Sequence, residues 1–520
     1  MTISLSTRLD SCLKALPRTY SGPGGACAVL CAGEVLARHT WGWANAERRI
    51  SFTPRTLFRM CSITKQFTCA LLLDVFPDPS VLDGDVRARL PLLEEPAPSA
   101  LHLCHNQSGL RDYWALAMLH GAPPEAPFGD TEATRVIVGA RTLHFAPGTR
   151  YSYANQNFRI LSDILEEHTG RSFAELLRSR IFERAGMNSA LLLADTRATP
   201  DGTEGYEGTP ATGFRAAENR IFWSGDAGLG ACLDDMIAWE RHVDATRDDA
   251  QALYNRLSVP VSFADGTSAA YGFGLNRAIE LGRPVTGHGG ALRGWRSHRL
   301  YVPSERVSVV VMFNHLADAY EAAVDLLAAV LGEDRRPPAV TVPMPDWLGA
   351  YTEPETGLAV RIDAEANGRV RLRYGQSPER LDLQADGTAT CATARLRPDN
   401  SRLWMDRPQE NQSSRLCPRY GAPTTDVAGR YRCEELDAEL IVADAGSVLY
   451  GGFSGFLGQG RMEMLDLVGP DIWALPCPRA LDHRPPGDWT LAFRRNGAGR
   501  VTSVEVGCWL ARHLPYLRIG

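Results

Sequence analysis

The sequence predicts an α/β unit over residues 1–331 and two small antiparallel β-barrels over residues 346–417 and 418–520. Three observations indicate this division. Helical and strand patterns alternate up to residue 331, a charged and proline-rich linker follows over residues 332–345, and short alternating apolar runs between turn residues fill the rest. A chain of 520 residues is also longer than one ordinary domain.

The first unit combines helices with strands. Apolar side chains recur at helical spacing in four segments; in the segment from Ser62 to Val75 they stand at positions 63, 67, 70, 71 and 75. We expect helices over residues 62–75, 157–169, 233–243 and 319–331. Runs of apolar and β-branched residues predict strands over residues 27–37, 298–302 and 307–313.

The last part carries strand signals and a weak internal repeat. Alternating runs predict strands over residues 358–362, 370–374 and 440–442. The segment Trp347–Tyr351 recurs as Val427–Tyr431, and each copy precedes an acidic turn and an alternating strand. Because small open sheets leave unpaired edges, we expect two similar barrels that close their own edges.

Composition excludes several classes of partner. A net charge of −6 gives no electrostatic footprint for nucleic acid or for an anionic membrane. No apolar run reaches the length of a membrane helix, and the first ten residues lack the pattern of a secretory signal. The 12 cysteines are scattered, which favours buried thiols in a reducing compartment, so we expect a cytoplasmic protein.

The first chemical signal is a Ser-x-x-Lys motif at Ser62 and Lys65. Of 55 basic side chains only Lys14 and Lys65 are lysines, and lysine, unlike arginine, can release its proton near neutral pH. Residues three apart share a helix face, so a neutral Lys65 can activate the Ser62 hydroxyl. Ser11 and Lys14 form a second copy without a buried helix after it, and we interpret Lys14 as a solvated cation.

Two further motifs supply polar groups. Tyr153 and Asn155 form Tyr-x-Asn in a loop before the 157–169 helix. A tyrosine whose pKa is lowered by a nearby cation can relay a proton, and the Asn155 amide can hold substrate or orient Lys65. His288 lies among three glycines, where it can hydrogen-bond an acyl group, and we expect the amides of Ser62 and Ala291 to form an oxyanion hole. No second His or Cys lies at ligand spacing, so no metal is expected.

These three motifs, in this order, resemble the penicillin-recognising serine hydrolases, which include class C β-lactamases, D,D-carboxypeptidases and related esterases. The resemblance implies a β-lactamase-like domain with a central antiparallel sheet flanked by helices. Supporting framework blocks are residues 106–113, 181–187 and 225–229. Where β-lactamases and D,D-peptidases usually carry Lys-Thr-Gly, this chain has His288-Gly289-Gly290. The missing cation argues against substrates with a free carboxylate and for an esterase or aminopeptidase.

The length, the stretch from Gly287 to Arg296 and the two trailing β-domains resemble the D-aminopeptidase branch of that family. This resemblance implies release of an N-terminal D-residue, such as D-alanine, from peptides, amides or esters. It also implies a loop from the last β-domain that enters the cleft, for which the proline-rich segment 476–487 is the match. Asp482 is the only carboxylate of that loop and is expected to pair with the substrate's α-ammonium. By the same resemblance, Asn276 and Arg296 are expected to line the cleft.

The expected reaction is therefore a two-step acyl transfer that needs no metal or organic cofactor. The expected partners are small peptides or amides with a free N-terminal D-residue, with β-lactams as inhibitors and a homodimer as the assembly that the resemblance suggests. Two alternatives stay open: a carboxylesterase or D-amino-acid amidase on the same scaffold, and an inactive protein that binds peptidoglycan peptides.

Overall fold

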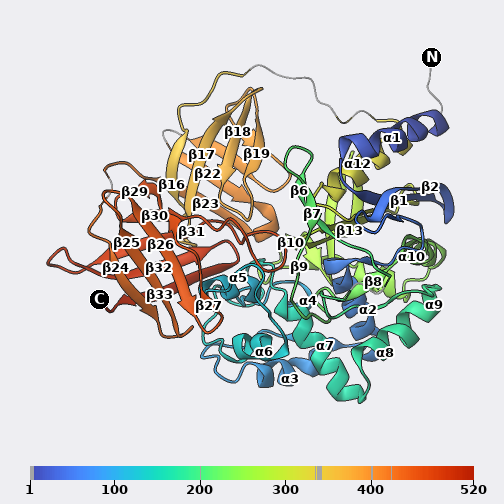
Figure 1. Cartoon of the computed structure of the whole chain (residues 1–520), viewed down its shortest axis with the longest axis horizontal. Coiled ribbons are helices and arrows are strands. Elements are labelled where there is room, and N and C mark those ends of the chain that lie inside the picture. Colours follow the sequence, from blue (N-terminus) through green and yellow to red (C-terminus); the bar gives the residue numbers. More distant parts are fainter. Residues whose placement is uncertain (1–4, 199–200, 334, 336–341, 400–401, 423) are drawn as a thin grey trace.

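The computed structural model describes residues 5–198, 201–333, 335, 342–399, 402–422 and 424–520. Figure 1 shows a unit of helices and one sheet beside two β units that lie next to each other. This is the predicted fold class, with one difference: the first β unit is a closed barrel as expected, whereas the sheet of the second follows a path that does not close. Part of the linker expected over residues 332–345 lies outside the described residues.

An eight-stranded antiparallel sheet forms the centre of the first unit, in the order β11-β12-β13-β14-β15-β1-β2-β3. Its strands are β1 (Gly24–Cys31), β2 (Glu34–Asn45), β3 (Ile50–Ser51), β11 (Tyr271–Gly272), β12 (Leu275–Glu280), β13 (Arg283–Leu292), β14 (Trp295–Val302) and β15 (Val307–Phe313). The strands predicted over residues 298–302 and 307–313 are confirmed, and every residue of β15 is buried. A strand covered on both faces has no polar side to display, which explains its uninterrupted apolar sequence.

The segment predicted as one strand over residues 27–37 is two strands. β1 ends at Cys31 and β2 begins at Glu34, and the pair is antiparallel. Ala32 and Gly33 both have positive φ, 51° and 78°, which suits a tight hairpin turn. The prediction was wrong because an Ala-Gly pair carries a weaker turn signal than Asn-Gly or Asp-Gly.

Helices cover both faces of the sheet. They are α1 (Leu5–Thr19), α2 (Thr64–Val75), α3 (Asp83–Arg89), α4 (Ala100–Cys104), α5 (Tyr113–Leu119), α6 (Asp130–Val138), α7 (Gln156–Thr169), α8 (Phe173–Leu177), α9 (Glu183–Ala185), α10 (Leu233–Ala245), α11 (Leu253–Leu257) and α12 (Ala319–Leu331). The helices α1 and α12 pack together on one face, against Cys27 and Val29 of β1. The alternate residues Ala26 and Ala28 face the larger core that contains α2.

Small elements complete this unit. They are η1 (Cys61–Ile63), η2 (Pro79–Leu82), η3 (Arg178–Phe182), β4 (Phe58–Arg59), β5 (Leu191–Leu192), β6 (Tyr206–Thr209), β7 (Gly213–Ala216), β8 (Leu229–Ala231), β9 (Val261–Ser262) and β10 (Ser268–Ala269). The strands β4, β8 and β5 form a small sheet next to η1. They therefore support the turn that carries Ser62.

The first β unit is a closed barrel of β16 to β23. Its strands are β16 (Gly349–Thr352), β17 (Ala359–Glu365), β18 (Arg369–Arg373), β19 (Glu379–Leu383), β20 (Ala389–Thr390), β21 (Arg395–Asp399), β22 (Arg402–Arg407) and β23 (Gln412–Pro418), with a short turn η4 (Pro408–Glu410). In β17, β18 and β22 buried side chains alternate with more exposed ones. That period of two is the pattern from which β17 and β18 were predicted, whereas β22 was not predicted.

The second β unit is a ten-stranded antiparallel sheet whose main path runs from β27 to β29. Its strands are β24 (Gly429–Cys433), β25 (Ala438–Asp444), β26 (Leu449–Gly455), β27 (Gly458–Gln459), β28 (Glu463–Met464), β29 (Asp466–Gly469), β30 (Ile472–Leu475), β31 (Trp489–Arg495), β32 (Val501–Cys508) and β33 (Ala511–Arg518). The internal repeat has a structural counterpart. Tyr351 donates a hydrogen bond to the carbonyl of Trp347, and Tyr431 donates one to that of Val427, both at 2.6 Å.

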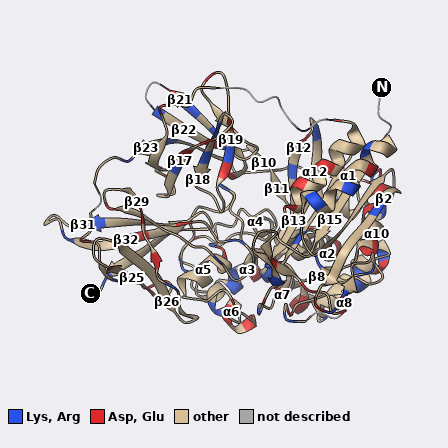
Figure 2. Ribbon diagram, turned by 45° about the horizontal axis from the view of Figure 1, so that its top comes forward, with Lys and Arg blue, Asp and Glu red and all other residues tan. Residues whose placement is uncertain are grey.

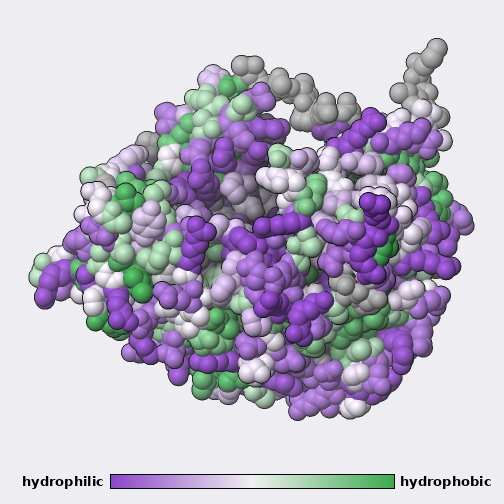
Figure 3. All heavy atoms as spheres, viewed as in Figure 1, coloured by the Kyte–Doolittle hydropathy of each residue, from purple (hydrophilic) through white to green (hydrophobic). Residues whose placement is uncertain are grey.

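In the ribbon of Figure 2 basic and acidic residues are interspersed along many of the elements. In Figure 3 hydrophilic side chains predominate and apolar residues lie in small groups. Among the described residues no helix is long and apolar enough to cross a lipid bilayer.

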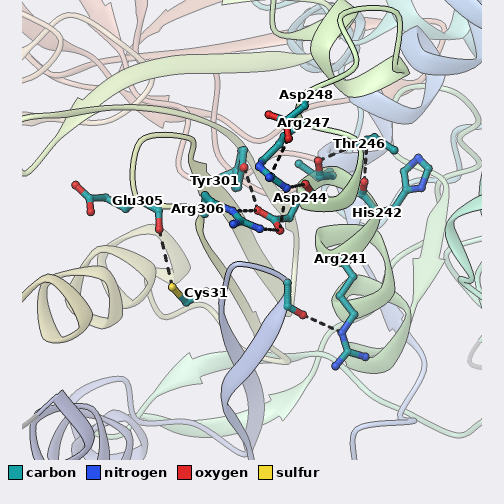
Figure 4. A network of polar contacts seen from close by, with 12 residues as sticks. Cys31, Arg241, His242, Asp244, Thr246, Arg247, Asp248, Tyr301, Glu305 and Arg306 are labelled. Atoms are coloured by element: carbon teal, nitrogen blue, oxygen red, sulfur yellow. Dashed lines mark hydrogen bonds and ion pairs between the residues drawn. The ribbon is translucent and has the colours of Figure 1, made fainter.

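A polar network at the end of α10 holds the sheet to its covering helix. The buried Asp244 carboxylate accepts hydrogen bonds from Arg306 Nε at 3.1 Å and Nη2 at 2.7 Å, beside Arg247 and Tyr301 (Figure 4). This network joins α10 to the turn between β14 and β15. The polar groups of this network are hydrogen-bonded to one another, so we interpret the network as structural.

Candidate active site

Ser62 lies on η1, directly before α2, and is half-buried. The preceding residue, Cys61, has φ of 51°, an uncommon value for a residue with a side chain. Thr64 holds the turn, because its hydroxyl donates to the Cys61 carbonyl at 2.6 Å and accepts from Leu229 N at 2.9 Å. The turn therefore presents the Ser62 hydroxyl at the start of a helix, where backbone N–H groups are unpaired.

Strand β13 passes close to this turn because Gly290 has no side chain. A Cβ atom at Gly290 would lie 2.0 Å from the Met60 carbonyl oxygen and 2.3 Å from Ser297 Oγ. The missing side chain at Gly290 therefore makes room for the turn that carries the nucleophile.

Lys65 points at Ser62 and is fully buried. Its Nζ donates to Ser62 Oγ at 3.1 Å, to Asn155 Oδ1 at 2.8 Å and to the Asp226 carbonyl at 2.7 Å. Burial lowers the pKa of Lys65 to about 8, against the opposing charges of Asp226 and Asp112. A neutral amine is therefore accessible near physiological pH. The other lysine, Lys14, is exposed on α1.

Tyr153 lies beside the same pair. The Lys65 Nζ stands 4.8 Å from the centre of its ring. Burial raises the pKa of Tyr153 well above its ordinary value, although a hydrogen bond with Ser62 opposes the shift. The expectation of a tyrosine with a lowered pKa was therefore wrong, because desolvation outweighs the nearby amine. Tyr153 carries its proton and is a donor in the resting site.

Asn155 is the last residue before α7, and its side chain is buried. Its Oδ1 is the acceptor for Lys65, so the amide orients the amine, as one of the two sequence interpretations held. Asp112 holds the amide from the other side, through bonds to both nitrogens of Asn155.

His288 is buried on β13 and is neutral. Burial and the charge of Lys65 lower the pKa of His288 to about 3. Its Nδ1 lies 2.6 Å from the Gly289 carbonyl, which can only accept, so Nδ1 carries the hydrogen. Its Nε2 then accepts from the Tyr271 hydroxyl at 3.1 Å. The ring is thus a fixed neutral group and not a second cation.

A cavity of about 320 Å³ joins these groups to the C-terminal units. Eight of the residues singled out in the sequence line it: Ser62, Tyr153, Asn155, Asn276, His288, Ala291, Arg296 and Asp482. Lys65 reaches this set through its bond to Ser62. The cavity therefore gathers residues that lie more than 400 positions apart in the chain.

The proline-rich loop reaches the cavity from the last β unit, between β30 and β31. Ala480, Asp482, His483, Arg484 and Pro486 line the wall. The backbone of Asp482 docks on the β13–β14 turn, because its carbonyl accepts from Arg293 N at 2.7 Å. A loop in this position closes one part of the cleft.

Asp482 is buried, and its surroundings disfavour its charge. Burial raises the pKa of Asp482 to about 7, and the nearby Asp112 carboxylate adds to the shift. His483 Nε2 lies 3.5 Å from its Oδ2, but burial lowers the pKa of His483 well below its ordinary range, so that ring is neutral. Among the described residues only this neutral ring is paired with the carboxylate, which can therefore gain a cation from a ligand.

Asn276 and Arg296 play different parts in the wall. Arg296 Nη1 donates to the carbonyls of Leu292 and Trp295, both at 2.7 Å. This part of the guanidinium therefore stabilises the β13–β14 hairpin to which Arg296 belongs. Asn276 stands opposite Gly287 in the sheet and is half-buried. Among the described residues no group of three or more His, Cys, Asp or Glu side chains could hold a metal ion.

Sequence reasoning missed Asp112, Tyr271 and His483. Asp112 lies in the framework block 106–113 that supports the family resemblance, and His483 follows Asp482 in the loop. In the sequence, Asp112 stands where an aspartate commonly caps the start of a helix, and this position does not indicate its contact with Asn155. The pairing of Tyr271 with His288 depends on the register of β11 to β13, which local sequence does not set.

Comparisons with known proteins agree over the whole chain. A family model described as β-lactamase matches residues 9–333, and one described as D-aminopeptidase, domain B matches residues 340–517. A D-aminopeptidase of Gluconobacter oxydans (strain 621H) is 60% identical over 527 residues, covering 100% of both chains. A D-aminopeptidase of Brucella melitensis biotype 2 (strain ATCC 23457) is 47% identical over 511 residues, covering 98% of each.

Solved structures of lower identity share the fold. D-amino acid amidase from Ochrobactrum anthropi SV3, complexed with D-phenylalanine, has a TM-score of 0.53 at 21% identity and matches 63% of this chain and 99% of its own. The octameric penicillin-binding protein homologue from Pyrococcus abyssi has a TM-score of 0.52 at 20% identity, with 79% and 99% covered.

Proposed function

The chain belongs to the D-aminopeptidase family of penicillin-recognising serine hydrolases and is a D-stereospecific aminopeptidase, and we propose that Ser62 is its nucleophile and Lys65 its base. The observation that carries this assignment is the single buried lysine whose amine meets the Ser62 hydroxyl at 3.1 Å. A lysine that is desolvated and hydrogen-bonded to a serine is an activated pair.

Acylation follows from the positions of these groups. Ser62 Oγ attacks the carbonyl carbon of the N-terminal residue and passes its proton to neutral Lys65. The amides of Ser62 and Ala291 stabilise the oxyanion. Tyr153 donates its proton to the departing nitrogen and recovers one from Lys65, which balances the step. The C–N bond breaks, the amine leaves, and an ester links the acyl group to Ser62.

Deacylation repeats the transfer with water. Lys65 accepts a proton from the attacking water, the tetrahedral intermediate collapses, and Ser62 Oγ regains its proton. The neutral His288 adds a hydrogen-bonding wall and no charge. Free D-amino acid is then released.

The substrate is an amino-acid amide, ester or short peptide, and we propose that it carries a free amine and a D-residue, with D-alanine preferred. Asp482 pairs with the α-ammonium, since it is a buried carboxylate in the cavity wall that lacks a cation of its own. Asn276 and Arg296 complete the wall around the substrate. A small N-terminal side chain fits a cleft that the loop partly closes.

The test compares variants on D-alanine p-nitroanilide. Ser62→Ala and Lys65→Ala should lose activity by three or more orders of magnitude with an unchanged melting temperature, because residual catalysis comes from binding alone. Lys14→Ala is the matched control, since it removes the other Ser-x-x-Lys lysine, which is exposed. Full activity in either active-site variant would remove that residue from the mechanism.

A second candidate, a D-amino-acid amidase or an esterase on the same scaffold, is favoured by the structural likeness to D-amino acid amidase. Peptides decide between them. Hydrolysis of D-Ala-Gly and D-Ala-Ala at rates near those of D-alanine amide supports the aminopeptidase, while restriction to the simple amide or indifference to the free amine supports the rival.

Three further properties belong to the same proposal. β-Lactams act as inhibitors that acylate Ser62, the chain forms a homodimer, and it works in the cytoplasm. All twelve cysteines are free, which fits a reducing compartment. A fluorescent penicillin that labels wild type but not Ser62→Ala, sedimentation at twice the chain mass, and cell fractionation test these points in turn.

A further inference from the structure

The side-chain amide of Asn155 works in only one orientation. A carboxamide presents an acceptor oxygen and a donor NH₂ group that differ little in shape. In the structure Oδ1 faces Lys65 Nζ at 2.8 Å. The reversed amide would place its NH₂ group against the amine, so one hydrogen bond would be lost and Lys65 would be displaced from Ser62.

Asp112 dictates that orientation. Its Oδ2 accepts from Asn155 N at 2.7 Å and from Asn155 Nδ2 at 2.8 Å. A carboxylate can only accept, so the Asn155 atom that faces it must be the NH₂ group. The other oxygen accepts from the backbone of Trp114 at 3.0 Å and Ala115 at 3.3 Å, and the side chain is fully buried.

The C-terminal sheet holds Asp112 in place. The turn between β32 and β33 comes within hydrogen-bonding distance of the catalytic unit, where Leu510 O accepts from Asp112 N at 3.0 Å. Beside it, Arg111 Nε donates to the Arg512 carbonyl at 2.7 Å. Gln156, the residue after Asn155, donates in turn to the Arg111 carbonyl at 2.5 Å. Asp112 is therefore bonded directly to this turn, and Asn155 is linked to the start of β33 only indirectly, through Gln156 and Arg111.

We propose that Asp112 is a positioning residue that fixes the Asn155 amide and, through it, the place of the Lys65 amine beside Ser62, and that the β32–β33 turn holds Asp112 in register. The proposal rests on the assigned roles of Ser62 and Lys65. It gives the second C-terminal unit a part in arranging the catalytic groups besides supplying a loop to the cleft. Asp112 touches no reacting atom in this scheme.

Asp112→Asn is the first test, because asparagine keeps the shape and keeps an oxygen to cap α5. With that oxygen on α5, its NH₂ group takes the place of Oδ2 and faces Asn155, which allows the Asn155 amide to reverse. Displacement of a catalytic group by about 1 Å costs about 100-fold in rate. We expect kcat on D-alanine p-nitroanilide to fall 10- to 100-fold with KM changed less than threefold.

The pH profile gives a readout that a purely structural role would not move. Four groups around Lys65 hold its pKa up against burial: Asp226, Asp112, Asp482 and Cys61. Asp112→Asn removes one negative charge, so the pKa of Lys65 falls. The acid limb of kcat/KM should therefore move to lower pH, even though the maximal rate is smaller. An unmoved limb would contradict the proposal.

A double-mutant cycle with Asn155→Ala decides whether Asp112 acts through Asn155. If it does, Asp112→Asn should cost less than threefold in kcat when residue 155 is already alanine. A full, additive loss in that background would show that Asp112 serves α5 or the interface instead, and the proposal would fall.

The matched control is Asp235→Asn. Asp235 is also buried and accepts from the backbone of Cys232 and Ser189 near the start of α10, away from the cavity. Its replacement should leave kcat and the pH profile unchanged. Ser62→Ala distinguishes failure of the proposed function from failure of the Asp112 proposal. If Ser62→Ala stays active, the proposed function fails. If Ser62→Ala is inactive but the double-mutant cycle is additive, only the role of Asp112 is refuted.

Discussion

Replacing Asp482 by asparagine should abolish selectivity for a free amine. The carboxylate lies in the cavity wall, burial raises its pKa to about 7, and the neutral His483 gives it no counter-charge. An α-ammonium with a pKa of about 7.7 to 8.0 is the natural partner. At pH 7.5 both groups are mainly ionised, so binding brings together a buried carboxylate and a cation.

The size of the effect follows from the burial of the pair. Removing one partner of a buried, hydrogen-bonded charge pair costs about 2 to 5 kcal/mol. At pH 7.5 a carboxylate of pKa near 7 needs only a few tenths of a kcal/mol to ionise, so nearly all of this cost should appear in kcat/KM. We expect a fall of roughly 30- to 5,000-fold for substrates with the amine.

The assay compares two esters that differ only in the amine, D-alanine p-nitrophenyl ester and propionyl p-nitrophenyl ester. Asp482→Asn should lower kcat/KM for the first and leave the second within threefold of wild type. Asp488→Asn serves as the control, because Asp488 is an exposed residue just after the loop that pairs with Arg361. Equal losses on both esters would refute the recognition of the ammonium and show that Asp482 only supports the loop.

The same variant should unfold at a higher temperature than wild type above pH 7. The pKa of Asp482 is raised on folding, so the protonated form favours the fold and stability is lost as pH rises from about 4 through 7. The loss amounts to about 4 kcal/mol at most, from three pKa units at 1.36 kcal/mol each. The difference in melting temperature between Asp482→Asn and wild type should vanish near pH 4, and a gap that persists there would contradict this origin.

Three further predictions concern the stability of the fold, the turn that carries the nucleophile and the proton donor. Glu240→Gln should lower the free energy of unfolding by about 3 to 5 kcal/mol, because it removes the counter-charge of the fully buried Arg299 and one of its two carboxylate acceptors; denaturant titration measures it. Gly290→Ala should cost about 100-fold or more in kcat, since its Cβ would overlap the turn that bears the nucleophile, while Gly84→Ala, which has open space, should be silent. Tyr153→Phe should lower kcat on the anilide 100- to 10,000-fold but much less on p-nitrophenyl esters, whose leaving group needs no proton; equal losses would remove its acid role.

Local pattern sufficed for elements whose burial is regular. The predicted helix over residues 157–169 corresponds to α7, Gln156–Thr169, because its apolar stripe faces a single core. The β17, β18 and β25 strands were predicted from their alternation. The β1–β2 hairpin was missed, because residues 27–37 are mostly apolar and the turn residues at 32 and 33 carry little polarity.

The chemistry of the site could be predicted only as far as residue types and spacing reach. Ser62 and Lys65 are three residues apart, so one helical turn fixes their contact. The pKa of Tyr153 went the wrong way, because burial by Tyr151 and Tyr271 depends on tertiary packing. The role of Asp112 was invisible for the same reason, since its partner Asn155 lies 43 residues further along the chain.

The distribution of charge around the nucleophile explains why this scaffold acts on the amino end of its substrate. A lysine in the position of His288 would place a second cation beside Ser62 and attract a carboxylate. Here His288 is neutral, and in the described part of the chain Lys65 is the only cation bonded to Ser62, and Lys65 itself can lose its proton. The strongest fixed charges that face Lys65 are the carboxylates of Asp112, Asp226 and Asp482. Arg296 and Arg484 also line the cavity, so the preference for a substrate cation is local to the carboxylates around Lys65. There the neutral His288 and the Asp482 carboxylate both favour a cation over an anion.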